Sequence, residues 1–273
     1  MMAPEARKTN YVIRGGAEGR ERLRLLSQIH RQSTLDLLQR AGVAPGMACL
    51  DVGCGGGDVC FELARLVAPD GSVLGIDIDA VKIDIAQREA RAQRLENVAF
   101  RVIDLEQGEL PLQFDFVHIR FVLSHLRNPQ KLLATIHGAL RPGGTIVVAD
   151  TQFYGFFSEP ESRALARGVE LYVKTIERRG ANANIGPRLP SMLAAAGFQD
   201  VQVGVVQHAH IRGEPKTILP LTVDFSADAI ITEGLASRAE MEALVAEMYE
   251  FAENPMSIIA GPRIIQAWAK AAS

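Results

Sequence analysis

The sequence predicts an α/β fold in which helices cover both faces of a doubly wound, mostly parallel sheet. Between residues 45 and 150, short apolar runs typical of strands alternate with segments of helical periodicity. A glycine-rich turn, residues 53–57, joins the first of these strands to the first of these helices. The chain has 273 residues, of which 48% are hydrophobic and 22% charged, so it is long enough for one such domain with sizeable insertions.

Turn residues and capping signals bound the elements of this alternating region. Prolines and glycines at residues 45–46 and 69–71 form turns before the first two strands. Pro129 suits the first turn of a helix, and Arg141-Pro142-Gly143-Gly144 ends that helix. The expected strands are residues 47–52, 72–77, 97–103, 114–119 and 145–149, and the expected helices are residues 58–67, 80–94 and 129–140.

The segments on either side of this region are less regular. Residues 1–20 are polar and contain several glycines, which is typical of a mobile arm, and residues 22–40 follow as an amphipathic helix. Beyond Asp150 two stretches, residues 151–186 and about 207–255, interrupt the strand and helix alternation. The elements expected there are helices at residues 161–178, 187–196 and 238–252, a strand at 201–206 and a final strand within 257–268.

Composition excludes several classes of partner. The net charge of −3 provides no basic field for nucleic acid. The N-terminus lacks an apolar core of signal-peptide length, and the chain has no run of about 18 apolar residues that could span a membrane. Cys49, Cys54 and Cys60 are odd in number and have no C-x-x-C spacing, which argues against a disulfide framework. We therefore expect a cytoplasmic protein without nucleic-acid or membrane partners.

The most informative stretch is Asp51-Val52-Gly53-Cys54-Gly55-Gly56-Gly57-Asp58. A glycine turn between a strand and a helix presents backbone N–H groups to a nucleotide-like ligand. A dinucleotide site requires G-x-G-x-x-G, and in that register Asp58 replaces the third glycine. A carboxylate at this point repels a pyrophosphate. A nucleoside that carries an ammonium and a sulfonium instead of phosphates has no such conflict, and S-adenosyl-L-methionine (SAM) is that ligand.

Acidic residues stand at or next to the ends of the first three predicted strands. The ends of parallel strands share one edge of the sheet, where ligands bind. Asp51 could hold an ammonium directly or through water, Asp77 the two ribose hydroxyls, and Asp104 the exocyclic adenine amine. Each feature alone has a plainer explanation: the glycine turn as a tight connection, Asp77 or Asp79 as a helix cap, Asp104 as a loop residue. Their joint occurrence favours a nucleoside ligand.

These motifs, in this order, resemble the class I SAM-dependent methyltransferases, in particular the small-molecule enzymes of ubiquinone and natural-product type. The resemblance covers about residues 45–150 and rests on Asp51–Gly57, Gly75–Asp79, Asn97–Asp104, Phe114–Val117 and Leu140–Gly144. It implies a Rossmann-like sheet of seven strands, the last one antiparallel and inserted between strands five and six, with helical lid insertions. The implied segments are a cofactor lid at residues 1–44, a SAM-binding core at 45–150, a lid insertion at 151–186 and the rest of the core at 187–273, with a second lid insertion at about 207–255.

The resemblance also implies which residues contact the cofactor. Strand four ends at Arg120, whose backbone would flank the methionine portion. Tyr11 belongs to an N-terminal arm of the kind that closes over SAM, and it would reach the carboxylate; a disordered tail is the alternative. Gln32 on the following helix is a weaker candidate for the same pocket. The expected cofactor contacts are Tyr11, Asp51, Gly53, Gly55, Gly57, Asp77, Ile78, Asp104, Leu105 and Arg120.

Methyl transfer from a sulfonium is an in-line displacement, so we expect the protein mainly to position the acceptor and exclude water. A general base is needed only where the acceptor must lose a proton. Histidine titrates nearest neutral pH, and His125 and His210 are the preferred candidates, followed by His118 and His208. A structural role is the alternative for each of them.

The acceptor pocket is expected to lie in the two irregular stretches, which are rich in aromatic and aliphatic residues. The candidate acceptor contacts are Phe153, Tyr154, Phe157 and Tyr172, although some of these must pack the lid itself. We therefore expect a small apolar or aromatic metabolite, with O-methylation favoured and N- or C-methylation open. No metal-ligand set is evident, so we expect a metal-independent enzyme, and a homodimer is left open.

Two other functional classes remain after this reading. One is a SAM-binding protein of the same fold that catalyses no methyl transfer, or that performs cyclisation or decarboxylation instead. The other is a nicotinamide-dependent dehydrogenase, which Asp58 disfavours. Binding of SAM rather than NAD separates the second class, and methyl transfer to a panel of metabolites separates the first.

Overall fold

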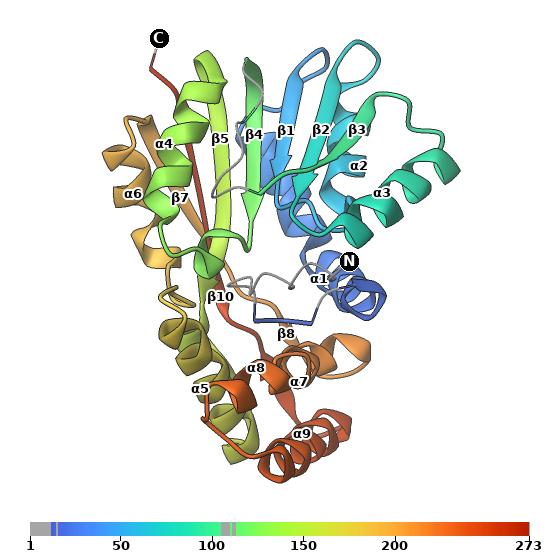
Figure 1. Ribbon diagram of the computed structural model, residues 1–273, viewed down its shortest axis with the longest axis vertical. Helices are drawn as coiled ribbons and strands as arrows, with labels where there is room; N and C mark the ends of the chain where they lie inside the picture. Colours follow the sequence, from blue (N-terminus) through green and yellow to red (C-terminus); the bar gives the residue numbers. More distant parts are fainter. Residues whose placement is uncertain (1–11, 15, 105–109, 111–112, 273) are drawn as a thin grey trace, which may run out of the picture.

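The computed structural model of the protein describes residues 12–14, 16–104, 110 and 113–272 (Figure 1). A seven-stranded sheet forms its centre, and β10 runs antiparallel to both of its neighbours while the other pairs are parallel. In sheet order, the strands are β3 (Val98–Val102), β2 (Ser72–Asp77), β1 (Ala48–Val52), β4 (Phe114–Arg120), β5 (Leu140–Gln152), β10 (Arg263–Lys270) and β7 (Gln199–Val206). This order confirms the expected Rossmann-like sheet, including the antiparallel last strand between strands five and six.

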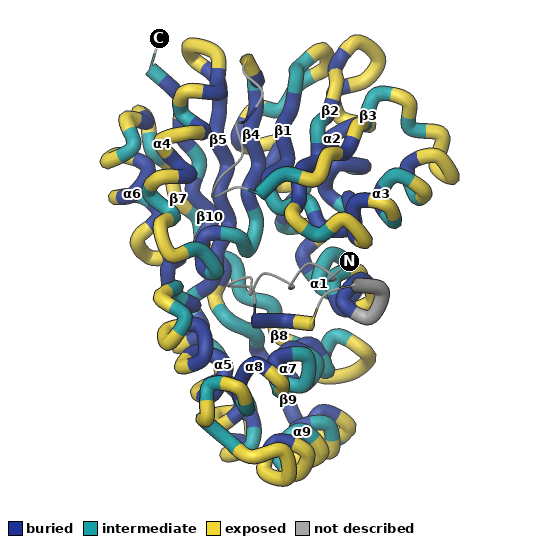
Figure 2. The backbone as a smooth tube through the Cα atoms, viewed as in Figure 1, coloured by how far each residue is buried: buried dark blue, intermediate teal, exposed yellow. Residues whose placement is uncertain are grey.

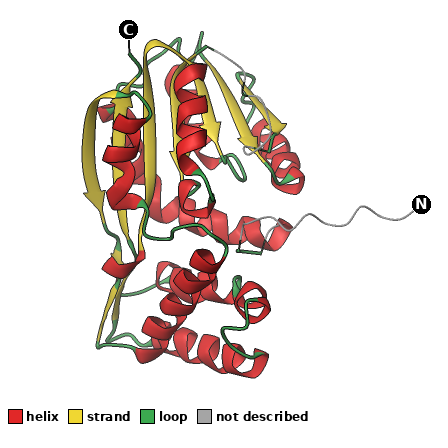
Figure 3. Ribbon diagram, turned by 60° about the vertical axis from the view of Figure 1, so that its left-hand side comes forward, coloured by secondary structure: helices red, strands yellow, loops and turns green. Residues whose placement is uncertain are grey.

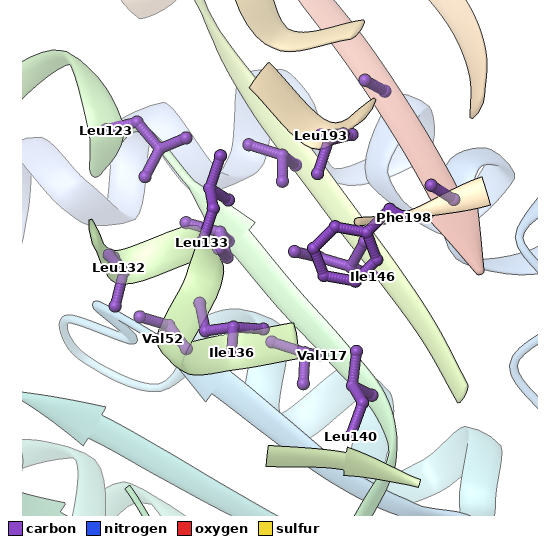
Figure 4. Close-up of a cluster of buried hydrophobic side chains, with 14 of the residues drawn as sticks. Val52, Val117, Leu123, Leu132, Leu133, Ile136, Leu140, Ile146, Leu193 and Phe198 are labelled. Carbon is purple, nitrogen blue, oxygen red and sulfur yellow. The ribbon is translucent and has the colours of Figure 1, made fainter. Parts of the chain in front are cut away.

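Helices cover both faces of the sheet, and Figure 2 shows that its central strands are largely buried, whereas the outer strands β3 and β7 are more exposed. One face packs against α1 (Gly16–Arg40), α2 (Asp58–Val67) and α3 (Ala80–Ala92), with Leu38, Leu63 and Ala86 fully buried. The other face packs against α4 (Pro129–Ala139) and α6 (Leu189–Ala195), where Leu133, Ile136 and Leu193 meet the strands (Figure 4). The two apolar cores hold the strand ends in fixed register.

A layer of helices with its own core lies beyond the C-terminal ends of β1, β2 and β4, at the position expected for the lid, and keeps that name below (Figures 1 and 3). Its helices are α5 (Arg163–Arg178), α7 (Ile218–Asp224), α8 (Ala227–Thr232) and α9 (Arg238–Glu253). A small antiparallel sheet joins it, in the order β6 (Phe157–Glu159), β9 (Ile258–Ala260) and β8 (Ala209–His210). These three strands have two or three residues each, too few to produce a detectable alternation in the sequence.

The structure changes several of the expected boundaries. Helix α1 begins at Gly16 rather than near residue 22, because Arg20 fastens its first turns to α2 and α3 through Asp58 and Glu89. The expected final strand is two strands, β9 and β10, separated by Gly261 and Pro262. Pro262 has no N–H for a strand ladder, and the N–H of Gly261 donates to the carbonyl of His208 (3.0 Å).

Candidate active site

A cavity of about 600 Å³ lies between the C-terminal ends of the strands, helix α1 and the lid. It opens at the point where the strand order reverses between β1 and β4, the usual ligand position in sheets of this kind. Its volume falls within the range of small-molecule sites. The cavity therefore brings the expected cofactor end and the expected lid into one space.

Gly53 and Gly55 line the cavity and have left-handed backbone conformations (φ +69° and +54°). A Cβ on Gly53 would lie 2.4 Å from Cγ2 of Val122, so only glycine lets the turn approach β4 this closely. Gly57 does not line the cavity. A Cβ there would fall about 3 Å from Phe61 and Phe100, so this glycine serves packing beneath the turn.

Asp77 and Asp104 also line the cavity, together with Ile78, whose side chain is 47% exposed. The carboxylate of Asp77 accepts the N–H of Gly55 (2.9 Å) through Oδ2 and the N–H of Asp79 (2.9 Å) through Oδ1. These bonds fix its orientation and tie the glycine turn to the end of β2. Asp79 is the N-cap of α3, which agrees with the alternative that the sequence offered for this residue. Tyr11 and Leu105 lie outside the described residues.

Asp51 is buried, and both of its carboxylate oxygens have protein partners. Oδ1 lies 2.8 Å from Nδ1 of His118 on β4, and Oδ2 accepts from Sγ of Cys60 (3.1 Å). An ionised carboxylate only accepts, so His118 donates through Nδ1. Asp51 therefore lines the cavity as part of this buried pair, and its expected contact with an ammonium, direct or through water, stays a prediction.

Asp58 pairs with Arg20 of α1, whose guanidinium donates to Oδ2 (2.8 Å) and Oδ1 (3.0 Å). The same guanidinium donates to Glu89, and it lies against Gly56. The guanidinium compensates the charge of Asp58, so the repulsion that Asp58 would exert on a pyrophosphate is weaker than the sequence alone indicates. Arg20 was missed from the sequence because its partners stand 38 and 69 residues away.

Arg120 lines the cavity from the end of β4, and its Nη1 donates to Oγ1 of Thr34 (2.9 Å). Burial lowers the pKa of Arg120, and the nearby carboxylates of Asp51 and Asp58 oppose that shift. Gln32 is exposed on α1 and donates to Asp36 (2.8 Å), so it lies away from the cavity.

His125 lines the cavity from a short 3₁₀ helix, η1 (Leu123–His125). The buried carboxylate of Asp150 holds this turn by accepting the N–H of Ser124 (3.0 Å). Burial, with smaller contributions from Arg22 and Lys82, lowers the pKa of His125 to about 3. His125 is therefore neutral over the working pH range and a weak base, which disfavours it as the proton acceptor.

Three further histidines gather on the cavity wall. The ring centroids of His30 and His208 are 4.7 Å apart, and those of His208 and His210 are 6.4 Å apart with nearly parallel planes. Oγ of Ser33 lies 3.3 Å from Nε2 of His208. Burial lowers the pKa of all three, so they are neutral at pH 7. His30 lies within the helical pattern of residues 22–40, and that pattern alone does not reveal that its ring faces the cavity.

The four candidate acceptor contacts divide into two pairs. Phe153 and Tyr172 are buried, line the cavity and have ring centroids 4.9 Å apart. Tyr154 is 71% exposed and Phe157 48% exposed, and neither lines the cavity. Within the 3₁₀ turn η2 (Phe153–Gly155) Phe153 is buried and Tyr154 is not, and Phe157 lies on an edge strand of the small sheet. The lid adds Ile218, Leu219 and Ile259 to the wall, all from outside the aromatic cluster of residues 153–157.

Within residues 12–14, 16–104, 110 and 113–272, no group of three or more His, Cys, Asp or Glu side chains is arranged to hold a metal ion. None of the described helices combines the length and the apolar character needed to cross a membrane.

Comparison with known proteins agrees with this geometry. Residues 44–184 match the protein family described as a methyltransferase domain. The demethylmenaquinone methyltransferase of Geobacillus stearothermophilus is 30% identical over 190 residues, which cover 64% of this chain and 80% of that protein.

Two solved structures share the fold. A Bacillus halodurans C-125 protein assigned as a methyltransferase has a TM-score of 0.60 at 18% identity, covering 88% of this chain and 98% of that one. The geranyl diphosphate C-methyltransferase of Streptomyces coelicolor A3(2), in complex with Mg²⁺, geranyl diphosphate and S-adenosyl-L-homocysteine, has a TM-score of 0.53 at 16% identity, covering 90% and 82%. The family match, the curated relative and the shared sheet together establish that this chain belongs to the class I SAM-dependent methyltransferases.

Proposed function

We propose that this SAM-dependent methyltransferase acts on a small, largely apolar or aromatic acceptor, with methylation of a hydroxyl oxygen favoured. The observation that carries the proposal is the cavity itself. One space runs from the acidic strand ends and the glycine turn to an apolar chamber beneath the lid. A donor and an acceptor could meet there without leaving the protein interior.

The cofactor half of the cavity suits SAM. Asp77 is held by two backbone N–H groups, and its remaining lone pairs are available to ribose hydroxyls. Ile78 offers exposed apolar surface to the adenine ring, and Asp104 lies on the same side as a hydrogen-bond acceptor. Gly53 and Gly55 leave the approach to the methionine portion free of side chains. Bound in this half, SAM supplies an electrophilic methyl group on a positively charged sulfur.

The acceptor half is lined mainly by apolar side chains. Phe153 and Tyr172 contribute one wall, and Ile218, Leu219 and Ile259 contribute the lid side. Burial of apolar ligand surface here is worth roughly 25 cal/mol per Å² removed from water. The same packing excludes water from the reacting atoms and limits the orientations that the acceptor can adopt.

His210 is the proposed proton acceptor for a hydroxylated substrate. Its imidazole lines the cavity, and burial together with nearby His208 lowers its pKa, so it is neutral and able to take a proton at pH 7. His125 shares the cavity but is a far weaker base, because its pKa is about 3. A carbon acceptor activated by an adjacent hydroxyl would use the same proton transfer, so C-methylation stays open.

The experiment is methyl transfer from SAM to a panel of hydroxylated aromatic compounds beginning with 2-naphthol, in which an oxygen and a ring carbon compete. Product mass and NMR identify the methylated atom. His210→Asn should lower kcat/KM by about 10²-fold or more, as expected for loss of a general base. His137→Gln, on α4 outside the cavity, is the control and should keep the rate.

Two results would contradict the proposal. Equal rates for His210→Asn and the wild type would remove His210 as the base. Binding of SAM without methylation of any compound in the panel would contradict the acceptor class, and would favour the non-methylating chemistry that the fold also permits.

A further inference from the structure

Arg22 of α1 is a buried cation that faces the cavity. Arg22 is only 7% exposed and lines the cavity. Its Nε donates to Oγ1 of Thr222 on α7 (3.2 Å). The hydroxyl of Thr222 in turn donates to the carbonyl of Ile218 (2.6 Å), so this anchor is itself held in place. Among the described residues, no carboxylate lies within 4.0 Å of the Arg22 guanidinium.

The neighbouring buried arginine of the same helix is fully matched by acids. Arg20 makes ion pairs with Asp58 (2.8 Å) and Glu89 (2.8 Å). A buried charge without a partner is strongly unfavourable, because the attraction that would offset its desolvation is missing. Arg22 therefore suggests that a ligand supplies an anion at this point of the cavity. The guanidinium donates to Thr222 through Nε, so its two Nη groups are not used by that contact, and a carboxylate can bind two guanidinium donors at once.

A second arginine in the cavity is in a similar position. Arg120 donates to the hydroxyls of Thr34 (2.9 Å) and Ser27 (3.5 Å), and within the described part of the chain it too has no carboxylate within 4.0 Å. SAM brings one carboxylate, on its methionine portion. Two guanidinium groups, neither with a carboxylate of the described residues within 4.0 Å, thus face a cofactor whose single carboxylate can neutralise only one of them.

The surroundings of the two arginines differ. Arg120 ends β4, next to the glycine turn, where Asp51 and Asp58 act on its charge. Arg22 is fastened to α7, whose Ile218 and Leu219 line the acceptor half. The carboxylate of the cofactor therefore belongs with Arg120, and the anion matched by Arg22 belongs to the other ligand.

We propose that the acceptor carries a carboxylate group and that Arg22 binds it. This inference rests on the proposed function and narrows it to acceptors with an apolar body and one acidic group. Lys82 also lines the cavity and acts with Arg22 on His125, but its Nζ pairs with Asp79 (3.7 Å), so Arg22 remains the cation for the acceptor's acidic group. The acidic group would also orient the acceptor, because a bidentate contact fixes direction as well as position.

The test is calorimetric titration of the protein saturated with S-adenosyl-L-homocysteine (SAH). The probes are matched acid and amide pairs of increasing size: hexanoate and hexanamide, 4-phenylbutyrate and 4-phenylbutanamide, 2-naphthoate and 2-naphthamide. In at least one pair the acid should bind about tenfold or more tightly than the amide, as expected for a hydrogen-bonded charge pair. Arg22→Gln should remove this preference, and Arg22→Lys, which keeps the charge, should retain part of it.

Arg24→Gln is the matched control, because Arg24 lies two residues further along α1, is exposed and pairs with Glu21. It should leave the acid preference unchanged. SAH should bind Arg22→Gln within about twofold of the wild type, whereas Arg120→Gln should weaken SAH about tenfold or more but not 5′-methylthioadenosine, which lacks the amino-acid portion. If Arg22→Gln does not fold, Thr222→Val, which removes only the anchor, should still reduce the preference.

The inference is overturned if no acid binds more tightly than its amide, or if Arg22→Gln weakens SAH while sparing 5′-methylthioadenosine, since Arg22 would then serve the cofactor. These titrations involve no methyl transfer. An enzyme that methylates only neutral hydroxylated acceptors would keep the proposed function and contradict this inference. Acid-selective binding without any methylated product would support this inference and contradict the proposed function.

Discussion

Asp51 on β1 and His118 on β4 form a buried pair across the centre of the parallel sheet, with 2.8 Å between Oδ1 and Nδ1. The two residues are direct partners in the register of these strands, at the edge where the cavity opens. Each is a polar residue in a strand whose other positions are mostly apolar. Each supplies a hydrogen-bond partner for the buried polar group of the other. The pair holds β1, β4 and, through Cys60, helix α2 together below the glycine turn.

The first prediction concerns the stability that this pair contributes. His118→Leu should lower the free energy of unfolding by about 2 kcal/mol, because it leaves the Asp51 carboxylate buried with Cys60 as its remaining partner. Asp51→Asn/His118→Leu should cost less than the sum of the two single changes, since the double variant buries no charge. Urea unfolding of the four proteins measures the coupling. Additive losses would show that the two residues do not stabilise each other.

The second prediction concerns Arg20, whose ion pairs hold α1 over the glycine turn. Arg20→Gln should lower the free energy of unfolding by about 1–3 kcal/mol through the lost charge-assisted hydrogen bonds to Asp58. It should also speed the dissociation of SAH, since α1 covers that side of the cavity. Stopped-flow release of SAH measures the second effect.

Arg24→Gln is the control for Arg20, because its ion pair with Glu21 is exposed and local to the helix. Its SAH release should match that of the wild type. Equal release rates for Arg20→Gln and the wild type would mean that α1 does not limit cofactor exit.

The short-range signals explain why the core of the fold could be predicted from the sequence. The glycine turn, the acids at the strand ends and the capping residues are each recognised from their neighbours in the chain, so their pattern survives in the sequence, although Asp77 also accepts the N–H of Gly55 on another loop. The expected strand of residues 72–77 and helix of residues 58–67 match β2 and α2 in both bounds.

The parts that could not be predicted depend on residues far apart in the chain. Arg20 meets Glu89, and Asp51 meets His118, only once the sheet has formed. Tyr154 next to Phe153 shows the same limit at short range, since the turn between them decides which ring enters the cavity. Composition identifies the aromatic cluster but not the direction of each ring.

The third prediction follows from the burial of His125, whose pKa falls from 6.5 to about 3 on folding. Below pH 6.5 His125 of the unfolded chain binds a proton that it does not bind in the folded chain, so its contribution to stability is constant above pH 6.5 and falls as the pH drops toward 3. The loss should be about 1.4 kcal/mol per pH unit. Urea unfolding at pH 7, 6 and 5 should show a shallower slope for His125→Gln than for the wild type. Parallel slopes would contradict the neutral burial of His125.

The fourth prediction concerns the pH dependence of the proposed proton transfer. Burial and His208 lower the pKa of His210 from 6.5, so its neutral form prevails at pH 7 and declines only below pH 6.5. With 2-naphthol, kcat/KM should be flat between pH 7 and 8 and fall on the acid side of the His210 pKa. His210→Asn should lower the plateau and lose this acid limb. An acid limb that persists in His210→Asn would assign the titration to another group.

The final prediction separates two adjacent aromatic residues. Phe153 is 7% exposed in the cavity wall against Tyr172, whereas Tyr154, the next residue of the same turn, is 71% exposed and does not line the cavity. Phe153→Leu removes the ring but keeps an apolar side chain, so it should raise the KM for 2-naphthol about tenfold, the equivalent of one aromatic contact of about 1.4 kcal/mol. Tyr154→Ala should leave this KM unchanged. Steady-state kinetics at saturating SAM make the comparison, and the SAH affinity of both variants serves as the control, because neither ring lies in the cofactor half. A similar rise in KM for the two variants would mean that the cavity beneath the lid does not hold the acceptor, since only one of these rings faces it.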